Sequence, residues 1–171
     1  MKIEKQILQK VDKYTKKSLG IELKQQGHYL TGGLESSIQG EINELPNGAV
    51  LEGSIADYGL IINTGATPSK IPYQENSGAK SSKYINGLIN YFKLRGLSEK
   101  EAKQAAFATA KVQKREGMPT ANSYQYAKNN ERKLFIEKTA ISISPIINDI
   151  VSKEIDTAVE KIFNKQQSEI I

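Results

Sequence analysis

The sequence predicts an α+β fold, in which a small antiparallel sheet is flanked by N- and C-terminal amphipathic helices and a helical pair is inserted. Three observations lead to this prediction. Apolar residues recur at helical spacing near both ends, two strand-like runs flank Asn47-Gly48, and two helical patterns follow a loop-like segment. The 171 residues suit a single domain spanning 1–171, because domains usually contain about 100–150 residues.

Residues 3–19 are predicted to form an amphipathic helix with a lysine-rich face. At about 100° per residue, apolar side chains fall on one side of this helix and lysines on the other. Gly20 is expected to end the helix. The apolar side consists of Ile3, Ile7, Leu8, Val11, Tyr14 and Leu19. The basic side consists of Lys2, Lys5, Lys10, Lys13, Lys16 and Lys17.

The net charge of +5 is concentrated near this first helix. Residues 1–24 carry seven lysines and three acidic residues, whereas the rest of the chain carries 17 basic and 16 acidic side chains. A nucleic-acid-binding protein more often spreads basic side chains over its binding face, so the charge alone does not predict that function. We expect a surface helix with solvated lysines, and a helix that binds a polyanion or a membrane surface is the alternative.

Two strands are predicted at 38–45 and 49–55, joined by a turn at 46–48. Asn-Gly is a strong hairpin signal because both residues tolerate positive φ. A further apolar run at 58–62 ends at Gly65. Residues 66–83 are predicted to form a flexible, proline-containing loop or arm, because Pro, Ser, Gly and Lys dominate its composition. A loop of this length is usually functional or becomes ordered on assembly.

A helical insertion is predicted at 84–117. Its second helix begins at Ser98, where Glu101 three residues later completes a capping box. This helix is rich in alanine, so we expect it to depend on tertiary or subunit packing. The first helix of the pair has an apolar face made of Ile85, Leu88, Ile89 and Phe92.

The C-terminal part is predicted to contain strand-like residues at 118–139 and then a long helix. Proline is favoured at the first helical position, so Ser144-Pro145 is the expected start of this helix. The last residues, 164–171, are expected to fray. The helix carries an apolar stripe made of Ile146, Ile147, Ile150, Val151, Ile155, Ala158, Val159, Ile162 and Phe163.

The sequence contains no convincing pattern for catalysis or for a metal or cofactor site. Cysteine is absent, which excludes thiol catalysis and cysteine-ligated metals. His28 is the only histidine and lies in a polar linker, where we expect it to be solvated. Residues 77–81 differ from a phosphate-binding P-loop because Ala79 separates the glycine from the lysine. We therefore expect a protein that is not an enzyme and has no cofactor.

The chain is expected to be a soluble intracellular product without membrane contact. Its first residues are charged and lack the continuous apolar run of a signal peptide. In addition, no stretch approaches the ~18 apolar residues that span a bilayer.

The helical pair also resembles the turn of helix-turn-helix DNA-binding proteins. Gly96 lies between the two predicted helices, as that motif requires. No third helix is predicted after Gly117, so the core and the base-reading face of the motif are incomplete. The basic side chains that could reach phosphates are Arg95, Lys100, Lys103, Lys111, Lys114 and Arg115. A DNA-binding regulator is therefore the alternative function.

Several segments follow one another in an order that is typical of a known family. Residues 31–38 read Thr-Gly-Gly-Leu-Glu-Ser-Ser-Ile and come after the first amphipathic helix. Residues 56–65 place a tyrosine before an apolar stretch, and residues 68–73 read Pro-Ser-Lys-Ile-Pro-Tyr. With the hairpin and the terminal helix, these segments resemble the tail-completion, or head–tail joining (neck), family of long-tailed bacteriophages. The family commonly has an acidic residue where Asn63 stands and Phe where Tyr73 stands, and the helical pair resembles an insertion into its shortest members.

This resemblance implies a non-catalytic structural protein of the virion, located in a ring around the DNA channel at the head–tail junction. It implies a homo-oligomeric ring with six-fold or twelve-fold symmetry that is assembled in the host cytoplasm. The implied partners are the head connector or a portal-side adaptor, the tail terminator or tail tube proteins, and packaged DNA. Such rings close through heterologous contacts between neighbouring subunits.

Two groups of residues are the candidate contact sites of such a ring. The loop at 66–83 is expected to become ordered on a neighbouring subunit or an adaptor, and a surface loop without a partner is the alternative. Its expected contact residues are Pro68, Ile71, Pro72 and Tyr73. Lysines of the first helix are expected to face DNA in the channel or an acidic partner through non-specific electrostatics. These lysines are Lys10, Lys13, Lys16 and Lys17.

Overall fold

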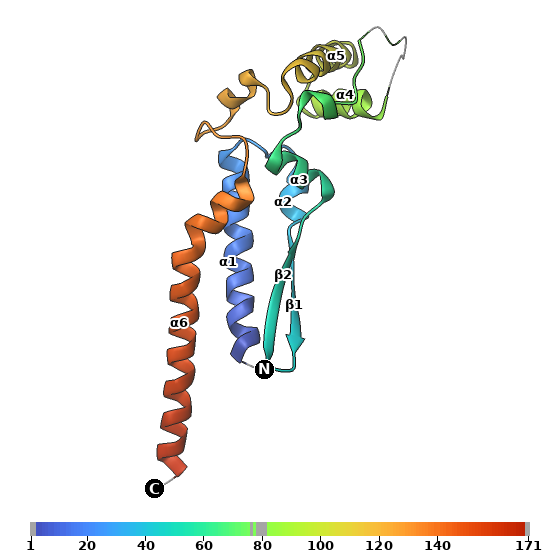
Figure 1. Cartoon of the computed structure of the whole chain (residues 1–171). Coiled ribbons are helices and arrows are strands. Elements are labelled where there is room, and N and C mark those ends of the chain that lie inside the picture. Colours follow the sequence, from blue (N-terminus) through green and yellow to red (C-terminus); the bar gives the residue numbers. More distant parts are fainter. Residues whose placement is uncertain (1–2, 76, 78–81, 170–171) are drawn as a thin grey trace. The chain divides into compact units, whose positions relative to one another are not determined.

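The computed structural model describes residues 3–75, 77 and 82–169, and these residues form two compact units (Figure 1). Unit 1 takes its described residues from 1–24, 32–56 and 134–171. Unit 2 takes its described residues from 25–31 and 57–133. Both units are therefore assembled from segments that lie far apart in the sequence.

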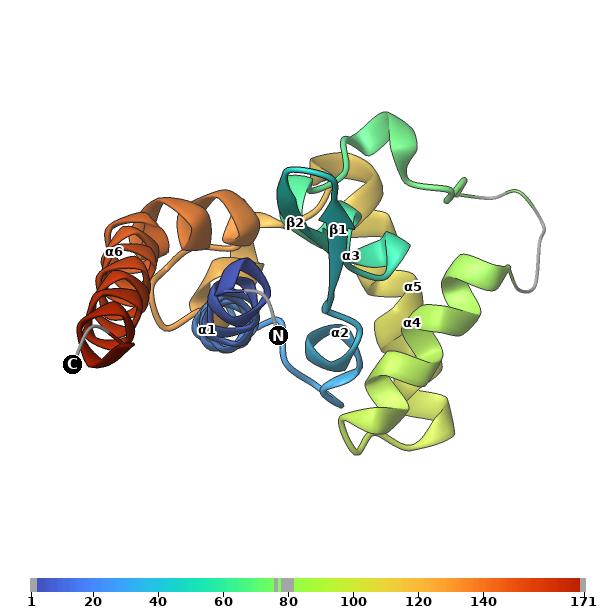
Figure 2. The ribbon, with the colours of Figure 1, turned by 90° about the horizontal axis from the view of Figure 1, so that it is seen from below.

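Unit 1 contains most of helix α1 (Ile3–Gln25), the short helix α2 (Gly33–Ser36), strands β1 (Gln39–Leu45) and β2 (Gly48–Ser54), and helix α6 (Phe135–Glu169). Figures 1 and 2 show α1 lying between the hairpin and α6. The C-terminal part of α6 continues past the beginning of α1 (Figure 1). The predicted α+β class is confirmed, with helices at both ends and a small antiparallel sheet.

The predicted hairpin is present with nearly the predicted bounds. Strands β1 and β2 pair antiparallel from Gln39 opposite Ser54 to Leu45 opposite Gly48. Gly40 allows the hairpin to approach α1, because a Cβ added there would lie 1.9 Å from Asp12 Oδ1. The core of unit 1 combines buried side chains from both ends of the chain, namely Ile7, Val11, Leu23, Leu34, Ile38, Phe135 and Ile143.

The prediction that Gly20 ends the first helix is wrong, because α1 continues to Gln25. Gly20 is buried in the helix, and the side chain of Glu35 lies against it. An added Cβ at Gly20 would lie only 2.4 Å from Glu35 Oε1. The same carboxylate accepts a hydrogen bond from Lys24 Nζ at 2.8 Å. Gly20 therefore allows the close contact with Glu35 and does not terminate the helix.

Unit 2 contains helices α3 (Asp57–Thr64), α4 (Lys83–Leu94) and α5 (Glu99–Glu116), with the 3-10 helices η1 (Pro68–Lys70) and η2 (Ala121–Tyr126). The two helices predicted at 84–117 correspond to α4 and α5, which pack against each other. The predicted capping box of α5 is confirmed, since Ser98 N donates to Glu101 Oε2 at 3.0 Å and Glu101 N donates to Ser98 Oγ at 3.4 Å.

The buried face of α5 is made of small side chains. Ala102, Ala106 and Ala110 are each 0% exposed and follow one another at a spacing of four residues. Side chains of this size allow close approach of a neighbouring helix but bury little area each. The stability of unit 2 therefore depends on tight packing along this face.

The prediction of strand-like structure at 118–139 is wrong. Tyr124 and Tyr126 lie in η2, and α6 has begun by Phe135. Only Met118 takes part in an isolated β-bridge among the described residues of this stretch, and its partner is Ala66. Local backbone hydrogen bonds, from Ser123 N to Thr120 O and from Ala127 N to Tyr124 O, form turns in place of the expected extended structure.

Helix α6 begins at Phe135, earlier than the start predicted at Ser144-Pro145, and Pro145 lies inside the helix. Proline cannot donate to the carbonyl four residues earlier, which here belongs to Ile141. Both residues are exposed, Ile141 at 77%, so water can supply the missing hydrogen bond. Figure 1 shows a bend in the first turns of α6, as an interior proline commonly produces.

None of the helices in the described ranges is both long enough and apolar enough to span a membrane.

Candidate interaction surfaces

The segment at 68–73, predicted to contact a neighbour, has defined partners inside unit 2. Helix η1 lies against α5. Lys114 Nζ, on α5, donates to the carbonyl oxygen of Ile71 at 3.1 Å. Further along, Lys111 pairs with Glu75 at 2.7 Å. The predicted arm is therefore tied to α5 up to at least Glu75, while residues 76 and 78–81 lie outside the described residues.

The four predicted contact residues of this segment differ in exposure. Ile71 is only 2% exposed, so its side chain anchors the segment within the isolated chain. Pro68 and Pro72 are exposed, and Tyr73 is half-buried. Contact with a neighbouring subunit stays a prediction for these four residues, and the surface available for it comes from Pro68, Pro72 and Tyr73.

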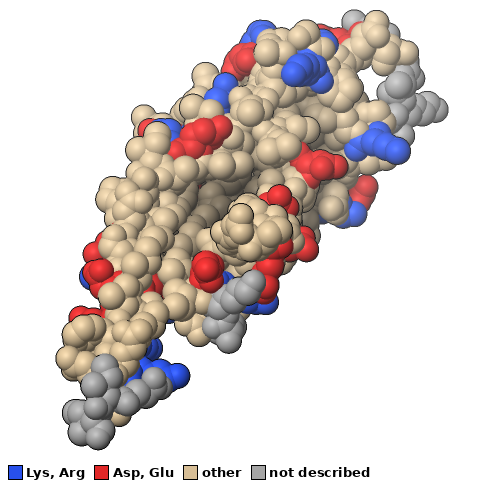
Figure 3. All heavy atoms as spheres, turned by 60° about the horizontal axis from the view of Figure 1, so that its bottom comes forward, with Lys and Arg blue, Asp and Glu red and all other residues tan. Residues whose placement is uncertain are grey.

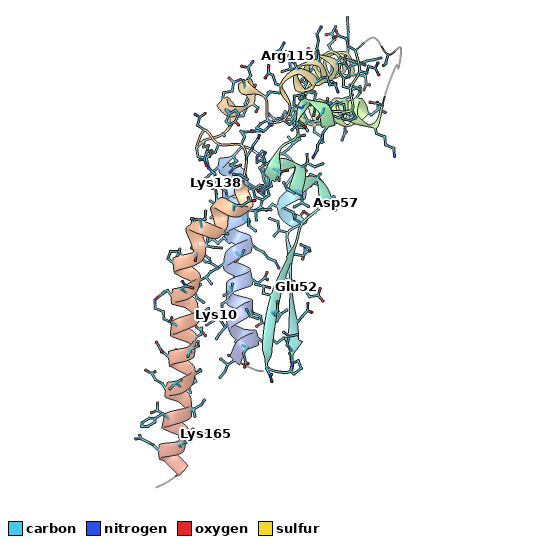
Figure 4. The ribbon with its side chains drawn as sticks, viewed as in Figure 1. Lys10, Glu52, Asp57, Arg115, Lys138 and Lys165 are labelled. Carbon is cyan, nitrogen blue, oxygen red and sulfur yellow. The ribbon has the colours of Figure 1, made fainter. Side chains whose placement is uncertain are left out.

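The predicted lysine face of α1 is partly neutralised by unit 1 itself. Lys10 pairs with Glu154 of α6 at 2.5 Å, and Lys16 pairs with Asp12 one turn earlier at 2.8 Å. Figure 4 shows Lys10 on α1. Lys13 and Lys17 have no ion pair with any described residue. Exposed pairs contribute only about 0–1 kcal/mol, so a polyanion could compete for Lys10 and Lys16 as well.

The charged side chains do not form one large basic region on the face that Figure 3 displays. Among the described residues of that face, Asp and Glu side chains are interspersed with Lys and Arg side chains (Figure 3). This distribution agrees with the modest net charge of +5. On this face, contact with DNA would therefore depend on particular lysines and not on a broad positive field.

The C-terminal half of α6 carries an uncovered apolar surface. Ile155, Val159, Ile162 and Phe163 are 48%, 59%, 55% and 58% exposed. Their spacing places them on one side of the helix. We call these four residues the α6 stripe. In Figure 4 the labelled Lys165 marks the part of α6 that continues past the beginning of α1. The apolar periodicity of the α6 stripe can be predicted from the sequence. The sequence does not show that this part of α6 extends beyond α1.

The described residues contain no candidate metal cluster, and His28 is placed by a contact with the backbone. No group of three or more His, Asp or Glu side chains within the described ranges could hold a metal ion. The expectation that His28 is solvated is wrong, because this side chain is half-buried and its Nε2 lies 3.2 Å from the carbonyl oxygen of Arg132. Burial, followed by the charge of Arg132, lowers the pKa of His28 to about 4. His28 is therefore neutral at pH 7, and Nε2–H donates to the carbonyl.

No protein-family model, no curated protein and no solved structure matches this chain.

Proposed function

We propose that this chain is a structural virion protein, a ring subunit of the phage head–tail connector that completes the neck between the head connector and the tail. The order of segments 31–38, 56–65 and 68–73 supports this proposal through its resemblance to the tail-completion family. In this role the protein carries no catalytic site and binds its partners through surfaces.

The observation that carries the proposal is the α6 stripe. Burying one side chain of this size typically stabilises a fold or a complex by about 1.5–3 kcal/mol. Unit 1 leaves Ile155, Val159, Ile162 and Phe163 about half exposed. A contiguous apolar surface rimmed by polar residues usually marks a protein–protein interface. We propose that the stripe packs against a neighbouring copy of the chain in the ring.

A ring requires two different surfaces on each subunit, because its contacts are heterologous. We propose that Pro68, Pro72 and Tyr73 belong to a second contact surface, since their exposed or half-exposed side chains lie on a segment that α5 already holds in place. Pre-ordering of this kind reduces the entropy that association must overcome. Lys13 and Lys17 are the lysines of α1 that remain for DNA or an acidic partner.

Native mass spectrometry of the full chain tests the role of the stripe. We expect the wild-type chain to form oligomers and the Ile162→Ser/Phe163→Ser variant to be predominantly monomeric. Ile141→Ser is the matched control, because Ile141 is a 77% exposed isoleucine of the same helix outside the stripe. A monomeric wild-type chain, or a stripe variant that assembles like the wild type, would contradict the proposed contact.

A DNA-binding regulator is the second candidate, and the connection between α4 and α5 favours it. Arg95 to Ser98 join the two helices, and Gly96 in this turn has a φ of 93°. Within the described part of unit 2, only the short helix η2 follows α5. Salt-sensitive binding to duplex DNA with a preference for one sequence would favour this function over the connector.

A further inference from the structure

Helix α4 has a covered side and an open side within the described part of unit 2. It packs against α5, and Ile85, on the covered side, is only 4% exposed. The open side contains Gly87, Tyr91 and Leu94, whose spacing of four and three residues places them together on the helix. Tyr91 and Leu94 are 37% and 54% exposed. Large apolar side chains therefore lie on a side of α4 that no described segment covers.

Gly87 stands in the middle of this open side without a described neighbour that requires a glycine. It is exposed, and no described atom lies within 4 Å of a Cβ added there. Glycine is unfavourable inside a helix, because it loses more backbone entropy on folding than other residues do. The distance between two packed helices depends on the side chains at their contact. Gly87 therefore provides a place where a second helix can approach the backbone of α4 closely.

Arg95 adds a positive charge to the same side of α4. It follows Tyr91 by four residues, and its guanidinium carbon lies 4.8 Å from the centre of the Tyr91 ring. Arg95 is exposed and forms no ion pair with another described residue. Tyrosine and arginine are enriched among the residues that contribute most to binding at protein interfaces. We call Gly87, Tyr91, Leu94 and Arg95 the α4 face.

The α6 stripe has properties that complement the α4 face. Asp156 and Glu160 lie seven and three residues before Phe163, so both carboxylates border the same edge of the stripe. Both are exposed, and neither forms an ion pair with a described residue. Lys165 lies beyond the opposite edge, three residues after Ile162. The stripe therefore has one acidic edge, which can pair with a cation in one orientation only.

We propose that the α6 stripe of one copy packs against the α4 face of a neighbouring copy, with the acidic edge of the stripe beside Arg95. Large side chains of the stripe then approach the α4 backbone at Gly87, between Tyr91 and Leu94. The carboxylates at the edge of the stripe pair with the guanidinium, which fixes the orientation of the contact. This inference rests on the stripe contact proposed above and identifies the surface that receives the stripe. The contact is heterologous, as a ring requires.

Gly87→Gln tests the α4 face without weakening α4 itself. Glutamine is a better helix former than glycine, and the space around Gly87 is open, so we expect the variant to fold. Its side chain fills the space that the stripe would occupy. Asn86→Gln is the matched control, because Asn86 is an exposed residue of the same helix outside the α4 face. Circular dichroism verifies that both variants keep their helix content.

Native mass spectrometry of a dilution series of the full chain measures self-association. We expect Gly87→Gln to raise the dissociation constant about tenfold or more, because it blocks the centre of the contact. Asn86→Gln is expected to stay within about twofold of the wild type. Assembly of Gly87→Gln with wild-type affinity, while Ile162→Ser/Phe163→Ser is monomeric, would overturn the α4 contact and leave the stripe contact in place. A monomeric wild-type chain would overturn both contacts.

Mixing two variants identifies the partner of the stripe. The Gly87→Gln chain keeps an intact stripe, and the Ile162→Ser/Phe163→Ser chain keeps an intact α4 face. Each is expected to be predominantly monomeric alone, whereas their equimolar mixture should contain heterodimers with one copy of each. A mixture without heterodimers would show that the stripe does not pack against the α4 face.

Charge reversal tests the orientation of the contact. Arg95→Glu and Asp156→Lys/Glu160→Lys should each weaken self-association, and a chain that carries all three substitutions should regain at least part of it. Failure of the combined variant to regain association would contradict the pairing with Arg95. The copy number of the chain in finished particles tests the connector function separately, so a failed α4 contact can be distinguished from a failed connector function.

Discussion

Ala66 and Met118 exchange two backbone hydrogen bonds, from Ala66 N to Met118 O at 2.9 Å and from Met118 N to Ala66 O at 2.7 Å. This bridge joins the residues that follow α3 to those that follow α5. A glycine with positive φ precedes each partner, Gly65 with a φ of 80° and Gly117 with a φ of 85°. A Cβ added at either glycine would lie 2.4 Å from the carbonyl oxygen of the opposite bridge residue.

Substitution of these glycines is therefore expected to destabilise unit 2. Gly65→Ala and Gly117→Ala should each lower the free energy of unfolding by more than about 1 kcal/mol, because both the positive φ and the backbone contact oppose a side chain. Urea unfolding followed by circular dichroism measures this change. Gly87→Ala is the control, since Gly87 lies in α4 with open space around it and should gain roughly 0.5–1 kcal/mol. Equal effects at all three positions would show that the bridge does not matter.

The alanine face of α5 provides a second test. Ala106→Leu should destabilise the protein by about 1–3 kcal/mol, because Ala106 is 0% exposed and the extra atoms have no space. Ala108→Leu is the matched control on the exposed side of the same helix and should change the free energy of unfolding by less than about 0.5 kcal/mol. A small effect at Ala106 would mean that α5 is less tightly packed than its burial indicates.

His28 makes stability depend on pH. Its pKa in the folded chain is about 4, compared with 6.5 for an ordinary histidine. Between these values the unfolded chain binds a proton that the folded chain does not, so stability falls as the pH is lowered from about 6.5 to about 4. Allowing for the partial exposure of His28, the loss should be roughly 1–2 kcal/mol.

Thermal unfolding at a series of pH values measures this dependence. His28→Gln is the informative variant, because its amide can donate to the Arg132 carbonyl but does not titrate. We expect the variant to lose the part of the pH dependence that lies between pH 6.5 and 4. An unchanged pH profile in His28→Gln would assign the dependence to the carboxylates instead.

The lysines of α1 are expected to contribute unequally to DNA binding. Lys13→Gln/Lys17→Gln should weaken non-specific duplex binding more than Lys10→Gln/Lys16→Gln, because Lys10 and Lys16 already pair with acidic side chains. Removal of each lysine that contacts a phosphate should also reduce the magnitude of the slope of log affinity against log salt by about one. The test is a salt titration of fluorescence anisotropy, and the same loss in both variants would indicate a diffuse effect of net charge.

Local signals in the sequence predict local structure well in this chain. The turn at Asn47-Gly48 predicts the hairpin, and the spacing of Ser98 and Glu101 predicts the start of α5, because both depend on residues close in sequence. In the sequence alone, Gly20 resembles the end of a helix. A glycine is needed there because Glu35, which belongs to another element, lies against it. In the sequence alone, Pro145 resembles the start of a helix. The proline is tolerated inside α6 because the carbonyl of the exposed Ile141 can bind water, and this exposure cannot be read from the local sequence.

For the candidate sites, too, local patterns can be predicted from the sequence, whereas contacts between distant segments cannot. The apolar periodicity of residues 146–163 is visible in the sequence, whereas the exposure of its C-terminal part depends on where the neighbouring helix begins. The burial of Ile71 could not be read from a loop-like composition, because α5 provides the contact. His28 and Arg132 come from two separate segments, so no local pattern brings them together.

Quantitative mass spectrometry of purified phage or prophage particles from the source tests the connector proposal most directly. We expect this chain to be present in finished particles at a low, fixed copy number, far below that of the major capsid protein. Such a result would place the protein among the structural components of the virion. Absence of the chain from finished particles would contradict the connector function.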